Sequence, residues 1–254
     1  MLVAQISDTH ILAPDQSNDR SLKRISSFKR CVEDINSLSI TPDVVIHTGD
    51  LTDNGLPEEY ATAKGILKSL EAPFYPTPGN RDGSRSMMAS FANDLNLSRE
   101  QDFMIYSVDD FKIRLISVDS LSESGPKGDF NEAKLKALGR ILNEAVAKPT
   151  VLFMHHPPFD VSADIQPFYE YNRPEAVDEL CDVIKDHKQL IGIFCGHIHR
   201  AFSTNFAGVR ASTMPSIALE LSQEISPVKK TNNPVYHLHK FHSSLEYETE
   251  IQHA

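Results

Sequence analysis

Short apolar runs alternate along this chain with segments whose apolar side chains recur every three or four positions, as Leu22, Ile25 and Phe28 do. A short apolar run is typical of a buried strand, and the longer spacing is typical of a helix that buries one face. The expected strands are 2–7, 44–46, 74–78 and 190–195, with a further strand that begins at Thr150. The expected helices are 21–38, 57–70, 85–97, 131–146 and 173–186. Because crossover helices join parallel strands, the alternation predicts an α/β fold.

The remaining segments predict additional β structure. The runs 104–108 and 113–118 flank Asp109 and Asp110, which favours a hairpin, and 202–250 is expected to be mostly β. A chain of 254 residues without repeats or a linker suits one domain over 1–254. Within it, we expect 227–254 either to complete a sheet or to supply a contact in a homodimer.

Composition excludes several classes of protein. The formal net charge is -10, from 25 basic and 35 acidic residues, which argues against a nucleic-acid binder because such proteins need a basic face. There is no run of 18 apolar residues, so no transmembrane helix is expected. The three cysteines, at 31, 181 and 195, are too few for a disulfide framework, which favours the cytoplasm.

Polar clusters follow the expected strands at the points where they end. They are Asp8-Thr9-His10, the run 49–53 (GDLTD), the run 79–82 (GNRD), the run 155–158 (HHPP) and the run 196–199 (GHIH). Ligands bind at the carboxyl ends of strands in open α/β sheets, so we expect these clusters to converge. On extended backbone, the i, i+2 spacing of Asp8 with His10, and of His197 with His199, would put each pair on one side.

Each cluster taken alone has an ordinary explanation. A single histidine at a strand end is usually a hydrogen-bonded or surface residue, and a Gly-Asp or Gly-Asn pair is usually a turn. Five clusters in succession, drawing on a chain with 11 histidines, are much more specific, because histidine is the commonest metal ligand.

Taken in order, DTH, GDLTD, GNRD, HHPP and GHIH resemble the motifs of the calcineurin-like metallophosphoesterases, over Asp8 to His199. The sequence around these motifs is similar to that of the bacterial class III cyclic-nucleotide phosphodiesterases and the related glycerophosphodiesterases. The resemblance implies a four-layer α/β/β/α sandwich with a dinuclear metal site. It also implies hydrolysis of small phosphodiesters, such as cAMP or glycerophosphodiesters, by in-line attack of a hydroxide that bridges the metals.

The resemblance further implies which residues hold the two ions. The first ion would be held by Asp8, His10, Asp50 and His199, and the second by Asp50, Asn80, His155 and His197, with Asp50 bridging. Two divalent ions and two carboxylates leave about +2 at the site, which attracts a phosphoester although the whole chain is acidic. The mixed nitrogen and oxygen ligands suit iron or manganese, with zinc and cobalt as alternatives. Paired ions lower the pKa of a bound water and clamp the attacking and leaving oxygens.

One position departs from the family pattern. Most relatives have histidine where this chain has Arg81, so the third motif is GNRD. Arginine binds phosphate oxygens in a bidentate manner but is a poor proton donor, because its pKa exceeds ~12. By the resemblance, the catalytic residues are Asp50, Asn80, Arg81 and His155, and the substrate-binding residues are Asn80, Arg81 and His199. The alternative for Arg81 is an ion pair with Asp82 or another acidic residue that turns it away from the metals.

Neighbouring polar residues are expected to support the site or to be unrelated to it. His156, Asp53 and Asp82 are expected behind the ligands or in turns, and His47 is expected to be structural. His237 and His239 have no motif around them and are expected on the surface. Substrate specificity is expected from the loops 121–130, 160–173 and 216–233. The aromatic residues of the second loop, Phe168, Tyr169 and Tyr171, either stack on a nucleobase or pack under the loop.

Three other functions stay open from the residues. The site could hydrolyse phosphomonoesters or phosphonate esters, since a dinuclear centre accepts several phosphoryl groups. A silent phosphate-binding module is disfavoured, because every expected ligand position is filled. A nuclease is disfavoured by the -10 charge.

Overall fold

The computed structural model describes residues 1–254 except 16, 96, 98–101, 162–170, 174 and 222–232. Two mixed sheets form its centre. The first has the order β11 (Tyr247–His253), β10 (Val235–Phe241), β1 (Leu2–Ile6), β2 (Val44–His47) and β3 (Phe74–Pro76). The second has the order β4 (Tyr106–Val108), β5 (Arg114–Val118), β6 (Thr150–Met154), β7 (Leu190–Cys195), β9 (Val209–Thr213) and β8 (Phe202–Phe206).

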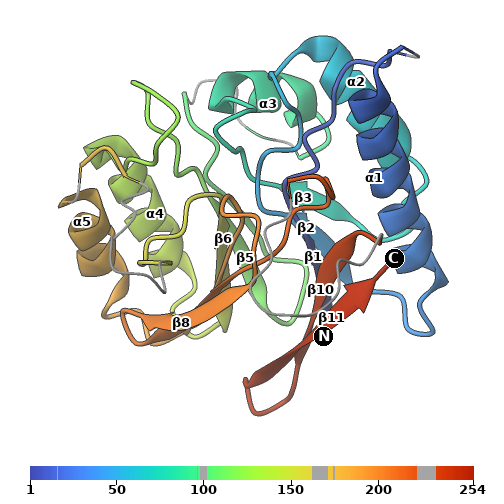
Figure 1. Ribbon diagram of the computed structural model, residues 1–254. Helices are drawn as coiled ribbons and strands as arrows, with labels where there is room; N and C mark the ends of the chain where they lie inside the picture. The colour runs from blue at the N-terminus through green and yellow to red at the C-terminus, as the bar shows by residue number, and fades with distance from the viewer. Residues whose placement is uncertain (16, 96, 98–101, 162–170, 174, 222–232) are drawn as a thin grey trace.

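Helices cover the outer faces of the two sheets. Figure 1 shows α1 (Asp19–Ser37), α2 (Pro57–Leu67) and α3 (Ser84–Phe91) on one side of the molecule, and α4 (Glu132–Glu144) and α5 (Glu175–Ile184) on the other. The strands β1, β2 and β3 are parallel, as are β5, β6, β7 and β9. The expected four-layer α/β/β/α sandwich is therefore confirmed.

Alternating side chains of the second sheet separate two hydrophobic cores. Along β6, Val151 and Phe153 pack into the core shared with the first sheet, whereas Leu152 and Met154 pack into the core under α4 and α5. This alternation follows from the period of two along a strand. Strands buried on both faces are nearly continuous apolar runs, which is why the sequence pattern indicates them clearly.

Two expectations about local structure are wrong: one helix is shorter than predicted, and the two histidines of β10 are not on the surface. The helix expected to end at Leu97 ends at Phe91, because Asn93 and Asp94 follow and these side chains favour turns over helix. The strands β10 and β11 extend the first sheet beyond β1, so β10 lies between two strands and one of its faces covers the second sheet.

This position of β10 buries the two histidines that were expected on the surface. His237 is 4% exposed and His239 is fully buried. The His239 ring stacks on Phe194 at 3.9 Å between centroids, and its two nitrogens hydrogen-bond to Gln5 Oε1 and Thr249 Oγ1. His239 is thus a hydrogen-bonded core histidine.

Candidate metal centre

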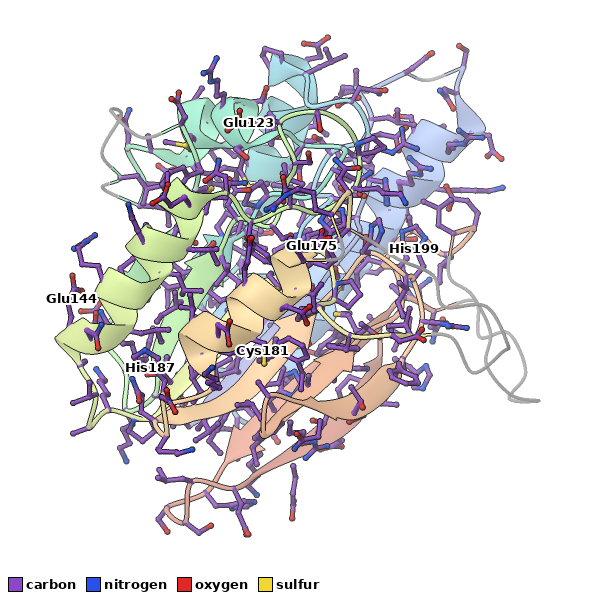
Figure 2. All side chains as sticks on the ribbon, turned by 90° about the vertical axis from the view of Figure 1, so that its left-hand side faces the viewer. Glu123, Glu144, Glu175, Cys181, His187 and His199 are labelled. Atoms are coloured by element: carbon purple, nitrogen blue, oxygen red, sulfur yellow. The ribbon has the colours of Figure 1, made fainter. Side chains whose placement is uncertain are left out.

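The polar clusters after five strands meet at one end of the sandwich, where the carboxyl ends of both sheets lie side by side. The loops after β1, β2 and β3 bring Asp8, His10, Asp50 and Asn80, and those after β6 and β7 bring His155, His197 and His199. Figure 2 shows His199 toward the same end as Glu175, at the start of α5, whereas Glu144 and His187 lie toward the opposite end. The predicted convergence is therefore what the fold produces.

The first cluster consists of Asp8, His10, His199 and one oxygen of Asp50. The His10 and His199 Nε2 atoms are 3.3 Å apart, and His199 Nε2 lies 3.3 Å from Asp8 Oδ1. His10 Nε2 lies 3.5 Å from Asp50 Oδ2. These side chains are at most about one-sixth exposed, with His199 the most open at 17%.

The second cluster consists of Asn80, His155, His197 and the other oxygen of Asp50. Asn80 Oδ1 lies 2.9 Å from His155 Nε2 and 3.1 Å from His197 Nδ1. His155 Nε2 lies 3.2 Å from His197 Nδ1 and 3.5 Å from Asp50 Oδ1. Asp50 therefore presents one carboxylate oxygen to each cluster.

Hydrogen bonds behind three of these histidines fix which ring nitrogen carries the proton. In each ring Nδ1 faces an oxygen that only accepts: Asp53 Oδ1 for His10 (3.1 Å), the Thr48 carbonyl for His155 (2.9 Å) and the Leu221 carbonyl for His199 (3.1 Å). In the neutral ring, Nδ1 therefore carries the proton, and Nε2 presents a lone pair to the cluster. Burial lowers the pKa of His155 to about 3, so its imidazole is neutral at pH 7.

The arrangement fits metal ions because electron pairs face one another without protons between them. Asp8 Oδ2 accepts from the Ser7 hydroxyl (2.5 Å) and from the His197 backbone N–H (3.1 Å). Asp8 Oδ1 is buried and, among the described residues, has no hydrogen-bond donor. A buried acceptor without a donor is costly, and a cation satisfies it. The nitrogen and oxygen donors of both clusters suit divalent transition metals.

The backbone at the ligands is not extended, contrary to the expectation from the i, i+2 spacing. The φ angles are positive at Asp8 (53°), His10 (46°), Asp50 (54°), His197 (73°) and His199 (54°). Such left-handed residues cost of order 1–3 kcal/mol each and persist where surrounding structure imposes them. The strained turns, and not strand alternation, aim these side chains at the site.

Two motif glycines allow ligands to approach the backbone of neighbouring loops. A Cβ on Gly79 would lie 2.3 Å from Asp50 Oδ1, and one on Gly49 would lie 2.5 Å from His155 Nδ1. Gly49 also has φ +90°, which L side chains rarely adopt. The glycines of GD and GN are therefore needed for packing against the ligands as well as for turning the chain.

Arg81 and Asp82 are neighbours in the chain, but the Arg81 side chain is exposed and that of Asp82 is buried. The Arg81 backbone N–H donates to Asp50 Oδ1 (2.7 Å), while its side chain is exposed and pairs with no acidic group in the part of the chain that the structure describes. Asp82 is buried and accepts from the backbone N–H groups of Leu51, Thr52 and Gly79 at 2.9–3.0 Å. The alternative ion pair between Arg81 and Asp82 is therefore wrong, and Asp82 holds the second and third motifs together.

His156 lies against the second cluster, with a ring nitrogen within 4.8 Å of nitrogens of His155 and His197. Its ring centroid is 4.4 Å from that of His197. Both of its nitrogens are engaged elsewhere, Nδ1 with Ser120 Oγ and Nε2 with the Pro126 carbonyl, each at 3.0 Å. This confirms the expected supporting place of His156. His47 is also buried, and its Nε2 lies 3.2 Å from Thr9 Oγ1, in agreement with a structural role.

Sequence reasoning missed the groups that hold the ligands from behind. Thr48 and Leu221 act through backbone carbonyls, which any residue supplies, so no sequence signal marks them. Arg24 carried a signal, because it lies between Ser21 and Phe28 on the buried face of α1, where an arginine is unusual. Asp53, expected to support the site, contacts both His10 and Arg24; although burial opposes the shift, these contacts lower the pKa of Asp53 to about 2.

The loop expected to recognise the substrate is partly described. Tyr171 is buried, stacks on Phe130 at 5.5 Å between centroids and donates to the His156 carbonyl, so its ring packs into the core under α4 and α5. Arg173 pairs with Asp129 and Glu179. Phe168 and Tyr169 lie outside the described residues.

Comparisons with known proteins agree with this geometry. The sequence model of the calcineurin-like phosphoesterase family matches residues 1–201. A probable glycerophosphodiester phosphodiesterase, GpdQ, of Arcobacter nitrofigilis is 33% identical over 243 residues, covering 94% of this chain and 88% of the relative. The 3',5'-cyclic adenosine monophosphate phosphodiesterase CpdA of Vibrio vulnificus is 23% identical over 249 residues, covering 98% and 88%.

A solved structure supports the fold. The crystal structure of a dimetal phosphatase from Danio rerio superposes with a TM-score of 0.73 at 15% identity, covering 99% of this chain and 95% of that one. Among the described residues, no helix is long and apolar enough to cross a membrane. Since the family model spans well over half of its length, the chain belongs to the calcineurin-like phosphoesterase family.

Proposed function

We propose that this protein is a phosphodiesterase that hydrolyses small phosphodiesters with two divalent metal ions. The observation that carries the proposal is the position of Asp50, whose Oδ2 faces the first cluster and whose Oδ1 faces the second, each 3.5 Å from a histidine nitrogen. A carboxylate between two sets of ligands is what a dinuclear centre requires. The first ion would be held by Asp8, His10, Asp50 and His199, and the second by Asp50, Asn80, His155 and His197.

Bound ions would supply Lewis-acid stabilisation and a water of lowered pKa for in-line attack on phosphorus. The residues themselves would position the substrate. Asn80 and His199 are only partly buried, so they form the face that a phosphoester meets. Arg81 follows Asn80 in the chain and its exposed guanidinium would bind phosphate oxygens, whereas the buried His155 and Asp50 would hold the centre rigid.

We further propose iron or manganese as the physiological ions, with zinc and cobalt as alternatives, because the ligands mix imidazole, amide and carboxylate. A cytoplasmic location is proposed on the three free thiols of Cys31, Cys181 and Cys195. We separately propose that the protein is a homodimer, and analytical ultracentrifugation measures its oligomeric state.

The substrate proposed first is a glycerophosphodiester, because the relative named for that activity is 33% identical and covers most of the chain. Cyclic nucleotides are the second candidate, supported by the 23% identical relative. Phosphomonoesters and phosphonate esters are the alternative substrate classes.

The experiment is a turnover screen of metal-reconstituted protein. Chelator-treated protein is loaded with Mn²⁺, Fe²⁺, Zn²⁺ or Co²⁺ and assayed with glycerophosphocholine, cAMP, bis-p-nitrophenyl phosphate and the matched monoesters. The expected result is turnover of diesters above monoesters, lost in Asp50→Ala. Full metal binding without turnover of any ester would contradict the proposal and indicate a phosphate-binding module.

A further inference from the structure

A buried arginine on α1 contacts the groups that stand behind both histidines of the first cluster. Arg24 is 2% exposed. Its Nη1 donates to Asp53 Oδ1 (2.8 Å) and to the backbone carbonyl of His10 (2.9 Å), and its Nε donates to Glu220 Oε1 (2.6 Å). Charge-assisted hydrogen bonds of this length are stronger than those between neutral groups. Burial of a guanidinium is costly unless such partners surround it.

On the His10 side, Arg24 holds both the imidazole partner and the backbone. Asp53 Oδ1 accepts from His10 Nδ1 (3.1 Å) and from Arg24 at the same time. Asp53 is 20% exposed on its side chain, so without the guanidinium its carboxylate could turn to water. The second contact, to the His10 carbonyl, fastens a residue whose φ is +46°.

On the His199 side, Arg24 acts through a tight turn. The Leu221 backbone N–H donates to the Ala218 carbonyl (2.9 Å), which closes the turn 218–221, and the Leu221 carbonyl accepts from His199 Nδ1. Glu220 lies inside this turn, and its carboxylate accepts the hydrogen bond from Arg24 Nε. The bond between Arg24 and Glu220 therefore ties the acceptor of His199 to the same helix that holds the acceptor of His10.

We propose that Arg24 is a positioning residue that orients His10 and His199 together, and so sets the affinity of the first metal site. This inference rests on the proposed function, since it concerns the ions that these ligands would bind. In the second cluster, His155 is oriented by the Thr48 carbonyl and no contact of Arg24 reaches it among the described residues. The effect of Arg24 should therefore be confined to one of the two sites.

The test is metal binding to an Arg24→Met variant, which keeps side-chain length and removes every donor. Equilibrium dialysis against Mn²⁺ followed by metal analysis gives the two affinities. We expect the first site to weaken about 10- to 100-fold, the range typical of lost partners behind a metal-binding histidine, with the second unchanged. In a His199→Ala background, which removes the first site, Arg24→Met should change nothing.

A matched control comes from the same helix. Arg30 Nη2 donates to Asn233 Oδ1 and to the Ala254 carbonyl, each at 2.7 Å, away from the metal ligands. Arg30→Met should lower the melting temperature and leave both affinities unchanged. If Arg24 were merely structural, Arg24→Met would behave in the same way. If Arg24 positions the ligands, Arg24→Met lowers the metal affinity of the first site and leaves that of the second unchanged.

The outcomes separate this inference from the proposed function. If the unaltered protein binds fewer than two ions, the proposed function fails whatever Arg24 does. If it binds two and Arg24→Met keeps both affinities, only the role of Arg24 is overturned. If Arg24→Met does not fold, Glu220→Ala decides, because it removes the acceptor of Arg24 Nε from a side chain that is 37% exposed; a first-site affinity equal to that of the unaltered protein would overturn the proposal.

Discussion

Replacing Gly79 with alanine tests whether the close approach of two loops sets the geometry of the metal centre. A Cβ at this position would lie 2.1 Å from the Asp50 backbone nitrogen and 2.3 Å from Asp50 Oδ1. Ordinary contact begins at 3.4 Å, so the carboxylate must move by about 1 Å. Metal–ligand distances tolerate only about 0.2 Å, and Asp50 is the ligand proposed to serve both ions.

The expected result is a large loss of activity with a moderate loss of stability. A misplacement of about 1 Å at a reacting centre can cost on the order of 100-fold in rate. Overpacking of a buried site costs about 1–3 kcal/mol of folding free energy. The assay measures kcat/KM with bis-p-nitrophenyl phosphate, metal content after dialysis, and the melting temperature of the same preparation.

A second glycine supplies the matched control. Gly65 lies in α2, and a Cβ there would meet nothing within 4 Å. Gly65→Ala should raise stability by about 1 kcal/mol, because alanine favours helix, and leave metal content and activity unchanged. If Gly79→Ala binds both ions and turns over substrate like the unaltered protein, the reasoning about close approach is refuted.

Three further outcomes are expected. Arg81→Ala should lower kcat/KM for diesters by about 10-fold or more through lost phosphate binding, while Arg85→Ala, which breaks an exposed pair with Asp102, should not; equal effects would contradict this. Removing metal with a chelator should lower the melting temperature, and metal at 100 times its Kd should restore about 2.7 kcal/mol per site; an unchanged melting temperature would contradict binding to the folded state. Burial lowers the pKa of His237 to about 4, so the unfolded chain takes up the proton first and the protein loses at most about 3 kcal/mol as the pH falls from 6.5 to 4. His237→Leu should lessen that loss in acid melting curves, and parallel curves for both proteins would contradict it.

The elements could be predicted from the sequence because buried parallel strands and amphipathic helices leave simple patterns. The run 151–154 is apolar throughout, since β6 is buried on both faces, and the fold confirms the strand. The first helix has its apolar positions three and four apart, and α1 buries Phe28, Val32 and Ile35 of that face, although Leu22 is exposed. The burial of His237 and His239 could not be predicted in the same way, because it depends on β10 pairing with β1, more than 200 residues earlier in the chain.

The convergence of these candidate ligands could also be predicted, but not the means by which the chain aims them. Extended backbone would place Asp8 and His10 together, whereas the chain does so with positive φ at both residues. Residue types at strand ends specify which atoms can bind a metal, and they carry no information on local dihedral angles. The strain at five ligands is sustained by surrounding contacts such as those of Asp82, whose carboxylate holds two loops at once.

The contacts behind the ligands show where sequence patterns stop being informative. Two of the three histidine acceptors are carbonyls, so substitution of Thr48 or Leu221 would leave the acceptor in place and their side chains are not constrained by it. The third acceptor, Asp53, is a side chain held by Arg24, and its loss cannot be replaced by the backbone. The candidate first metal site thus depends on at least two side chains behind its ligands, Asp53 and Arg24. It follows that changes at these two positions, away from the ligands, should alter the first site.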